Sequence, residues 1–170
     1  MSEFDQASTL ARSTLPLFPQ EVFDLWLYDR IKQNGWPPSG IEWEGFLFGE
    51  SLDFWGQLKW SKEKVALSAD KLSATSRRTA ELLHEASVLK QSNIMSHYIP
   101  NTRERFASVM AYALEHQALP GTLILLKREG SYDVVEGNHR VAVLLGLQSI
   151  QGHPNVPAIG EVEAWVASAA

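Results

Sequence analysis

The chain has 170 residues, of which 45% are hydrophobic and 21% are charged. This composition excludes an intrinsically disordered chain and provides enough apolar side chains for a packed core. The sequence contains no cysteine, which excludes disulfides, thiolate nucleophiles and cysteine-based metal sites. Its longest apolar runs fall well short of the ~18 residues that a membrane-spanning helix needs, so we expect no membrane segment.

The formal net charge is −5, and no part of the chain has a basic surplus. The first 64 residues contain 6 Lys or Arg and 10 Asp or Glu, and the other 106 residues contain 9 and 10. Binding to duplex DNA regardless of its sequence depends on basic side chains that displace counterions from phosphates. We therefore expect no non-specific binding of duplex DNA. The N-terminus has early acidic residues and no apolar run typical of a secretory signal, so a cytoplasmic location is expected.

The N-terminal part of the chain, residues 1–63, is predicted to be a helical extension rich in tryptophan. Residues 1–18 are expected to be loosely structured. A helix is predicted to begin at Pro19 and to end at Gly35, because apolar residues recur between them at helical spacing. Residues 41–60 are expected to form short helical pieces, since glycines interrupt any regular pattern there.

Aromatic side chains are concentrated in this extension, which holds 12 of the 17 Phe, Trp and Tyr within its first 60 residues. The simplest interpretation is that the rings fill a small helical core. The alternative is that they form a surface that binds another protein. The first interpretation predicts that most of four tryptophans are buried, namely Trp26, Trp43, Trp55 and Trp60.

The rest of the chain, residues 64–170, is predicted to mix helices and strands in one α+β core. The expected elements are a strand within 64–72, a helix at 76–91, a helix beginning at Asn101 or Thr102, a hairpin of strands 122–127 and 132–135, a helix over 141–147, and a last strand at 162–166. The fold class that follows is a small mixed sheet with packed helices. The helix at 141–147 has no polar face, so we expect it to be buried.

The segment Glu136-Gly137-Asn138-His139-Arg140 lies between the second hairpin strand and the apolar helix. Gly137 allows a tight turn, and His139 and Arg140 fall in the first helical turn, where free N–H groups and the helix dipole attract anions. The planar guanidinium of Arg140 suits phosphate. Glu136 would position a metal-bound phosphate or a nucleophile. The alternative is that Glu136 and Arg140 pair and only brace the junction.

This segment, preceded by a hairpin and followed by an apolar helix, resembles the signature of the ParB/sulfiredoxin superfamily: an acid, Gly, any residue, a polar residue such as His, and Arg. The resemblance covers residues 64–167 and implies a ParB/sulfiredoxin-like fold. It also implies that Gly137, Asn138, His139 and Arg140 bind the phosphates of a nucleoside triphosphate. In this interpretation Glu136 and His139 are catalytic, and Glu136 holds Mg²⁺.

Members of the superfamily include a sulfinic-acid reductase, a free-serine kinase, CTP-binding partition proteins and NTPase or nuclease components of phage defence. The reductase chemistry is excluded, because it needs a cysteine where this chain has Asn138. Partition proteins add a helix-turn-helix domain and a dimerisation tail after this core. Only 30 residues follow Arg140 here, and the chain is acidic, so chromosome partition is not expected.

Two classes of function remain. The first is an NTP-dependent phosphotransferase, NTPase or nuclease, in which Arg103 and Arg105 close the nucleotide site from the first turn of another helix. Such catalysis needs positive charge around the phosphates and usually Mg²⁺. The second is a non-catalytic ParB-like binding or regulatory module that contacts a protein partner through its aromatic N-terminal region.

Overall fold

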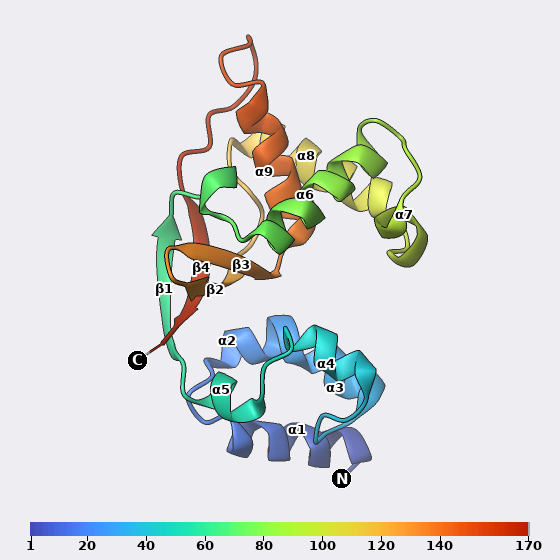
Figure 1. Ribbon diagram of the computed structural model, residues 1–170, viewed down its shortest axis with the longest axis vertical. Helices are drawn as coiled ribbons and strands as arrows, with labels where there is room; N and C mark the ends of the chain where they lie inside the picture. Colours follow the sequence, from blue (N-terminus) through green and yellow to red (C-terminus); the bar gives the residue numbers. More distant parts are fainter. Residues whose placement is uncertain (170) are drawn as a thin grey trace. The chain divides into compact units, whose positions relative to one another are not determined.

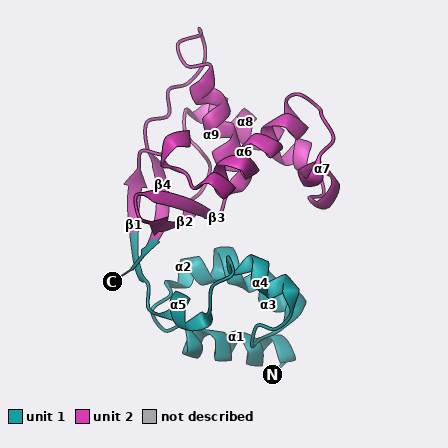
Figure 2. Ribbon diagram, in the orientation of Figure 1, with its two compact units in different colours: residues 1–61, 167–170 teal, residues 62–166 magenta. Residues whose placement is uncertain are grey.

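The computed structural model describes residues 1–169, and the chain divides into two compact units (Figure 2). The first unit comprises residues 1–61 and the last residues from Ala167, and the second comprises residues 62–166. Strands β1 (Lys59–Val65) and β4 (Val162–Ser168) contribute residues to both units. The sequence-based boundary after residue 63 therefore lies within β1.

The N-terminal unit is helical, in agreement with the sequence. Its elements are α1 (Glu3–Thr14), α2 (Gln20–Val22), the π-helical turn η1 (Phe23–Leu27), α3 (Tyr28–Asn34), α4 (Ile41–Phe46) and α5 (Leu52–Gly56). Helix α2 begins directly after Pro19, and α3 ends at Gly35, whose φ of 75° is easily adopted only by glycine. The short helical pieces expected at 41–60 are α4 and α5.

The expectation that residues 1–18 are loosely structured is wrong, because α1 occupies most of them. Its start is stabilised by a capping box: the Ser2 hydroxyl accepts the Asp5 N–H at 3.1 Å, and the Asp5 carboxylate accepts the Ser2 N–H at 3.1 Å. The helix buries only Ala11 and Leu15 at its end, so its apolar pattern is too weak to be seen in the sequence.

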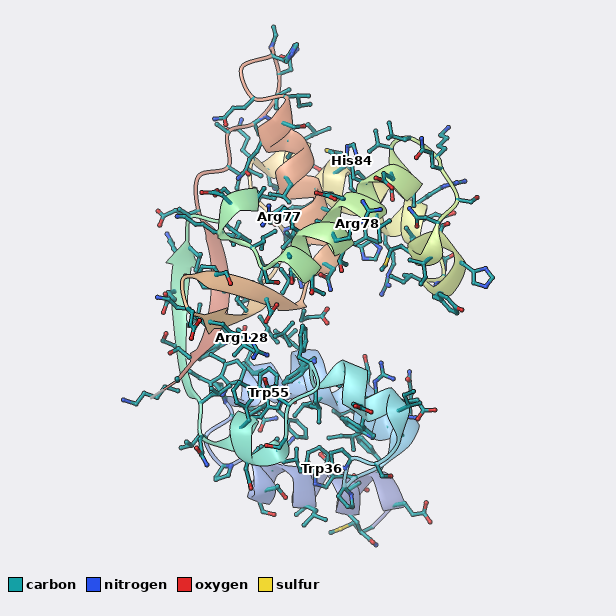
Figure 3. All side chains as sticks on the ribbon, in the orientation of Figure 1. Trp36, Trp55, Arg77, Arg78, His84 and Arg128 are labelled. Carbon is teal, nitrogen blue, oxygen red and sulfur yellow. The ribbon has the colours of Figure 1, made fainter. Side chains whose placement is uncertain are left out.

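Most of the tryptophans of this unit lie in an aromatic core rather than facing solvent. Trp26, Trp43 and Trp55 are 4%, 2% and 0% exposed, whereas Trp60 is half-buried. The Trp26 and Trp55 ring centroids are 4.8 Å apart, and the Trp55 indole N–H donates to the Leu47 carbonyl at 2.9 Å. Trp55 is labelled in Figure 3. The prediction that most of these rings are buried is confirmed.

The C-terminal unit combines helices with the sheet, which confirms the α+β class (Figure 1). Besides β1 and β4 it contains the 3₁₀ turn η2 (Ala69–Lys71), α6 (Ala74–Ser87), α7 (Ile94–Tyr98), α8 (Thr102–His116), β2 (Leu123–Arg128), β3 (Ser131–Glu136) and α9 (Asn138–Ser149). The four strands form a mixed sheet in the order β1-β4-β2-β3. Strands β2 and β3 are the predicted antiparallel hairpin.

The first strand was expected within 64–72, but β1 begins earlier, at Lys59. It is an edge strand, and most of its residues are exposed. Most side chains of such a strand face solvent, so it needs no apolar alternation, and charged residues protect its open edge. The short helix α7 was not predicted at all.

Some apolar residues in and after α6 and α8 lie outside the core. The helix predicted at 76–91 ends early: α6 ends at Ser87, and Leu89 lies beyond it with 55% of its surface exposed. Leu114 follows buried Ala113 on α8 and is turned about 100° away from it, so it faces solvent.

Helix α9 is buried, as its sequence predicts. Its fully buried side chains are Val141, Ala142, Val143, Leu144 and Leu147. They join one core with apolar side chains of α6, α8 and all four strands. The packing of these side chains holds α9 in place, and it therefore determines where the first turn of α9 lies.

The N-terminus of α6 covers the outer edge of β3. The Ser73 N–H donates to the Tyr132 carbonyl at 2.8 Å, and the Val134 N–H donates to the Ser76 hydroxyl at 2.8 Å. The Arg128 guanidinium, labelled in Figure 3, donates to the Asp133 carboxylate at 2.9 Å on the same strand pair. The bonds of Ser73 and Ser76 satisfy backbone groups of β3 that an open edge strand would expose.

Candidate functional site

A cavity of about 630 Å³ lies at the N-terminus of α9 in the C-terminal unit. Three elements surround it: the junction between β3 and α9, one face of α8, and the exposed side of α6. The lining residues are Thr79, Ile99, Glu104, Arg105, Ser108, Val109, Glu136, Gly137, Asn138, His139 and Arg140. All five residues of the sequence motif therefore line the same cavity.

The first turn of α9 presents backbone donors at this cavity. Gly137 is the N-cap, with φ of 107°, and no side chain caps the helix. The first helical bond runs from the Val141 N–H to the Gly137 carbonyl at 3.0 Å. The N–H groups of Asn138, His139 and Arg140 therefore have no carbonyl acceptor within the helix. Together with the helix dipole they favour an anion at this position.

Arg140 lies beside these donors but is also bonded to the backbone. Its Nη1 donates to the Pro120 carbonyl at 3.0 Å and to the Thr122 carbonyl at 3.2 Å. Its Nη2 is 4.0 Å from the Glu136 carboxylate, at the limit of an ion pair. Burial lowers the pKa of Arg140 from its usual value, while nearby Glu136 acts in the opposite direction. Arg140 thus braces the junction mainly through carbonyl groups, with Glu136 as a weaker partner.

Two glycines make room for the Arg140 guanidinium. A Cβ at Gly121 would lie 3.0 Å from Nη1, and a Cβ at Gly137 would lie 3.0 Å from Nη2. Both glycines have positive φ, which an L side chain rarely adopts. The guanidinium is therefore held in one position at the edge of the cavity.

His139 is neutral at physiological pH. Burial, with a smaller contribution from the positive charge of Arg105, lowers its pKa to about 4. Its Nε2 lies 3.4 Å from the hydroxyl of Thr102, a residue that is 3% exposed at the start of α8. His139 can therefore give or accept a hydrogen bond here but adds no positive charge to the site.

The lowered pKa of His139 predicts a pH-dependent stability. Between pH 6.5 and about 4 the unfolded chain protonates this histidine and the native chain does not, so its contribution is complete above pH 6.5 and is lost as the pH falls toward 4. We expect wild type to lose about 1 to 2 kcal/mol more than His139→Gln over this range, less than the full pKa shift would give because the ring is partly exposed. Urea unfolding of both proteins at pH 7 and pH 4 measures this difference, and equal losses would contradict it.

Of the two arginines predicted to close the site from α8, the structure brings only Arg105 to the cavity. Arg103 points to the end of α6, where its Nε donates to the Ala86 carbonyl at 2.8 Å and its Nη2 to the Lys90 carbonyl at 3.3 Å. Consecutive helical residues differ by about 100° in direction, so positions 103 and 105 do not share a face.

Sequence reasoning missed several residues that line the cavity. Ser108 and Val109 follow Arg105 at spacings of three and four, which is the signal that would have placed them on the same helical face. No spacing or motif in the sequence indicated that Glu104 or Thr79 would line the cavity. Thr79 comes from α6, and only the packing of α6 against α9 brings it to the cavity.

Glu136 is the residue predicted to provide an oxygen ligand to Mg²⁺. Its side chain is 44% exposed at the cavity, and a carboxylate is a hard ligand suited to this cation. Within residues 1–169 no group of three or more His, Asp or Glu could hold a metal ion. Mg²⁺ is commonly bound by one or two carboxylates together with substrate phosphates, so Glu136 fits a cation that arrives with a nucleotide.

Comparison of the chain with protein-family models, with curated proteins and with solved structures finds no match. Among the described residues, none of the helices has both the length and the apolar sequence needed to cross a membrane. The fold and the cavity define an α+β protein with a polar site at a strand-to-helix junction.

Proposed function

We propose that the cavity at the start of α9 binds the phosphate groups of a nucleotide, and that the C-terminal unit is a ParB/sulfiredoxin-like domain. The observation that carries the proposal is the convergence of Arg105, Arg140 and the unpaired N–H groups of α9 on one cavity. Charge-assisted hydrogen bonds from such groups are stronger than neutral ones and suit phosphate oxygens.

The reaction proposed is transfer or hydrolysis of a phosphoryl group. An oxygen nucleophile attacks the terminal phosphorus, the bond from that phosphorus to the bridging oxygen breaks, and the remaining phosphates leave with the bond electrons. Arg105 and Arg140 stabilise charge on the phosphate oxygens. Glu136 and neutral His139 line the cavity, and each can accept the proton of the nucleophile. Mg²⁺ held by Glu136 would supply further neutralisation of the phosphates.

Arg105→Ala is the sharpest test of nucleotide binding. Arg105 is exposed on α8, so we expect the variant to keep its melting temperature and to bind nucleotide at least about ten-fold more weakly, the effect of losing one charge-assisted bond. Isothermal titration calorimetry with ATP, CTP and GTP in Mg²⁺ measures the affinity. Lys127→Ala, an exposed residue on the hairpin, is the control and should bind like wild type.

Arg140→Ala should lose both nucleotide affinity and stability, because the carbonyls of Pro120 and Thr122 lose their donor. A purely structural role of Arg140 instead predicts lost stability with no nucleotide binding in wild type. The absence of heat with all three nucleotides would contradict the proposed function.

A second candidate function, a non-catalytic module that binds a protein partner, is favoured by the charge distribution. Residues 1–61 contain 4 Lys or Arg and 9 Asp or Glu, so they carry the whole net charge of the chain. Because Trp26, Trp43 and Trp55 are buried, the contacts would come from exposed residues such as Ile41, which is 80% exposed beside Glu42. This function predicts a complex with a basic protein that a Glu42→Lys, Glu44→Lys double variant abolishes, without nucleotide binding.

A further inference from the structure

A second cavity, of about 460 Å³, adjoins the phosphate cavity. It is formed by the loop before α7, by α7 itself and by the first turn of α8. Its lining residues are Ser92, Asn93, Ser96, His97, Ile99, Pro100, Asn101, Thr102, Arg103 and Glu104. Two of these, Ile99 and Glu104, also line the first cavity, so the two hollows share a wall.

A direct contact between two side chains lies at the boundary of the two cavities. Thr102 lines the second cavity, and its hydroxyl lies 3.4 Å from Nε2 of His139, which lines the first. One pair of contacting residues therefore separates the two cavities, and Ile99 and Glu104 border both of them.

The second cavity contains a rigid frame as well as groups that can contact a ligand. Asn93 belongs to the frame: its Oδ1 accepts the Met95 N–H at 2.9 Å, and its Nδ2 donates to the Leu82 carbonyl at 2.8 Å. Arg103 is likewise bonded to the Ala86 carbonyl. These bonds fix α7 and the start of α8 and so fix the shape of the cavity.

The groups that can contact a ligand differ in chemistry from those of the first cavity. His97 and Asn101 are exposed polar side chains that can hydrogen-bond to sugar hydroxyls or to the edges of a base. Ile99 and Pro100 provide an apolar surface for a planar ring. The first cavity, in contrast, has Arg105, Arg140 and the helix start, which suit phosphate.

We infer that the second cavity binds the base and ribose of the nucleotide whose phosphates occupy the first cavity, an inference that rests on the proposed function. A nucleoside is covalently joined to its phosphates, so its site must adjoin theirs, as this cavity does. Both volumes lie within the range usual for small-ligand sites. The competing occupant is a separate phosphoryl acceptor.

Comparison of nucleotides with inorganic tripolyphosphate separates the two cavities. In calorimetry with Mg²⁺, we expect the best-bound of ATP, CTP and GTP to bind wild type at least about ten-fold more tightly than tripolyphosphate, because only the nucleotide reaches the second cavity. His97→Ala and Asn101→Gly should each weaken that nucleotide about five-fold or more and leave tripolyphosphate unchanged. Glycine at position 101 keeps the left-handed backbone, where φ is 58°.

His116→Ala, an exposed histidine at the opposite end of α8, is the matched control and should bind both ligands like wild type. Equal affinities for nucleotide and tripolyphosphate, unchanged in both variants, would overturn the inference while the proposed function stands. Loss of both ligands in the variants would also overturn it. Binding of neither ligand to wild type would instead contradict the proposed function itself. Far-UV circular dichroism and melting curves establish that each variant is folded.

Discussion

Gly137→Ala is expected to destabilise the protein by about 2 to 5 kcal/mol. Gly137 has φ of 107°, a conformation that costs a non-glycine residue about 1 to 2 kcal/mol. The added Cβ would also overlap Leu123 Cδ2, lying closer to it than real atoms approach. Leu123 is 1% exposed, so its side chain has little room to move, and overpacking of this kind typically costs a further 1 to 3 kcal/mol, roughly.

Gly152→Ala is the matched control for this effect. Gly152 has φ of 100°, but nothing lies within 4 Å of an added Cβ. It should therefore show only the backbone cost, about 1 to 2 kcal/mol. Urea unfolding of both variants measures the difference. If both variants lost the same free energy of unfolding, the contact with Leu123 would not restrict position 137. The junction of β3 and α9 would then be more loosely packed than its geometry indicates.

Trp55→Ala is expected to cost the N-terminal unit about 3 to 5 kcal/mol, the usual loss for a buried aromatic residue. The side chain is 0% exposed, contacts Trp26 and donates to the Leu47 carbonyl at 2.9 Å. The substitution opens a cavity in the aromatic core and leaves that carbonyl without its indole partner. Unfolding should be followed by circular dichroism at 222 nm, because the variant changes tryptophan fluorescence.

Two further variants divide this effect into its parts. Trp55→Phe keeps most of the ring but loses the hydrogen bond, so it should cost about 1 to 3 kcal/mol. Trp36→Ala, which removes a half-buried ring labelled with Trp55 in Figure 3, should cost less than Trp55→Ala because the ring is partly solvated. If Trp36→Ala lowered the free energy of unfolding as much as Trp55→Ala does, the assignment of Trp55 to the centre of this core would be contradicted.

Much of the candidate site was predictable from local sequence. Glu136, Gly137, Asn138, His139 and Arg140 are consecutive, and a strand, a turn and an apolar helix are each defined by short-range patterns. Once such a strand and helix meet at a glycine, the first residues of the helix must share one end of it. The grouping of residues 136–140 at one place can therefore be predicted from local sequence alone.

The position of Arg103 was not predictable from local sequence. Both arginines near the start of α8 satisfy the same sequence criterion, yet Arg103 bonds carbonyls at the end of α6, and Arg105 lines the cavity. The rotation of α8 about its axis decides between them. That rotation follows from how Phe106 and Ala113 pack into the core, which is a tertiary property.

By itself, then, the sequence determined the α+β class, the hairpin, the buried helix α9, the burial of most N-terminal tryptophans and the motif at the strand-to-helix junction, because each depends on residues close together in the chain. Only the tertiary structure decided the placement of β1, the carbonyl partners of Arg140, the lowered pKa of His139 and the second cavity. These features depend on residues distant in sequence: the carbonyl bonds of Arg140 depend on Pro120 and Thr122, and the pKa of His139 depends on its burial and on Arg105. An edge strand such as β1 leaves no apolar pattern, because solvent rather than a core faces most of its side chains.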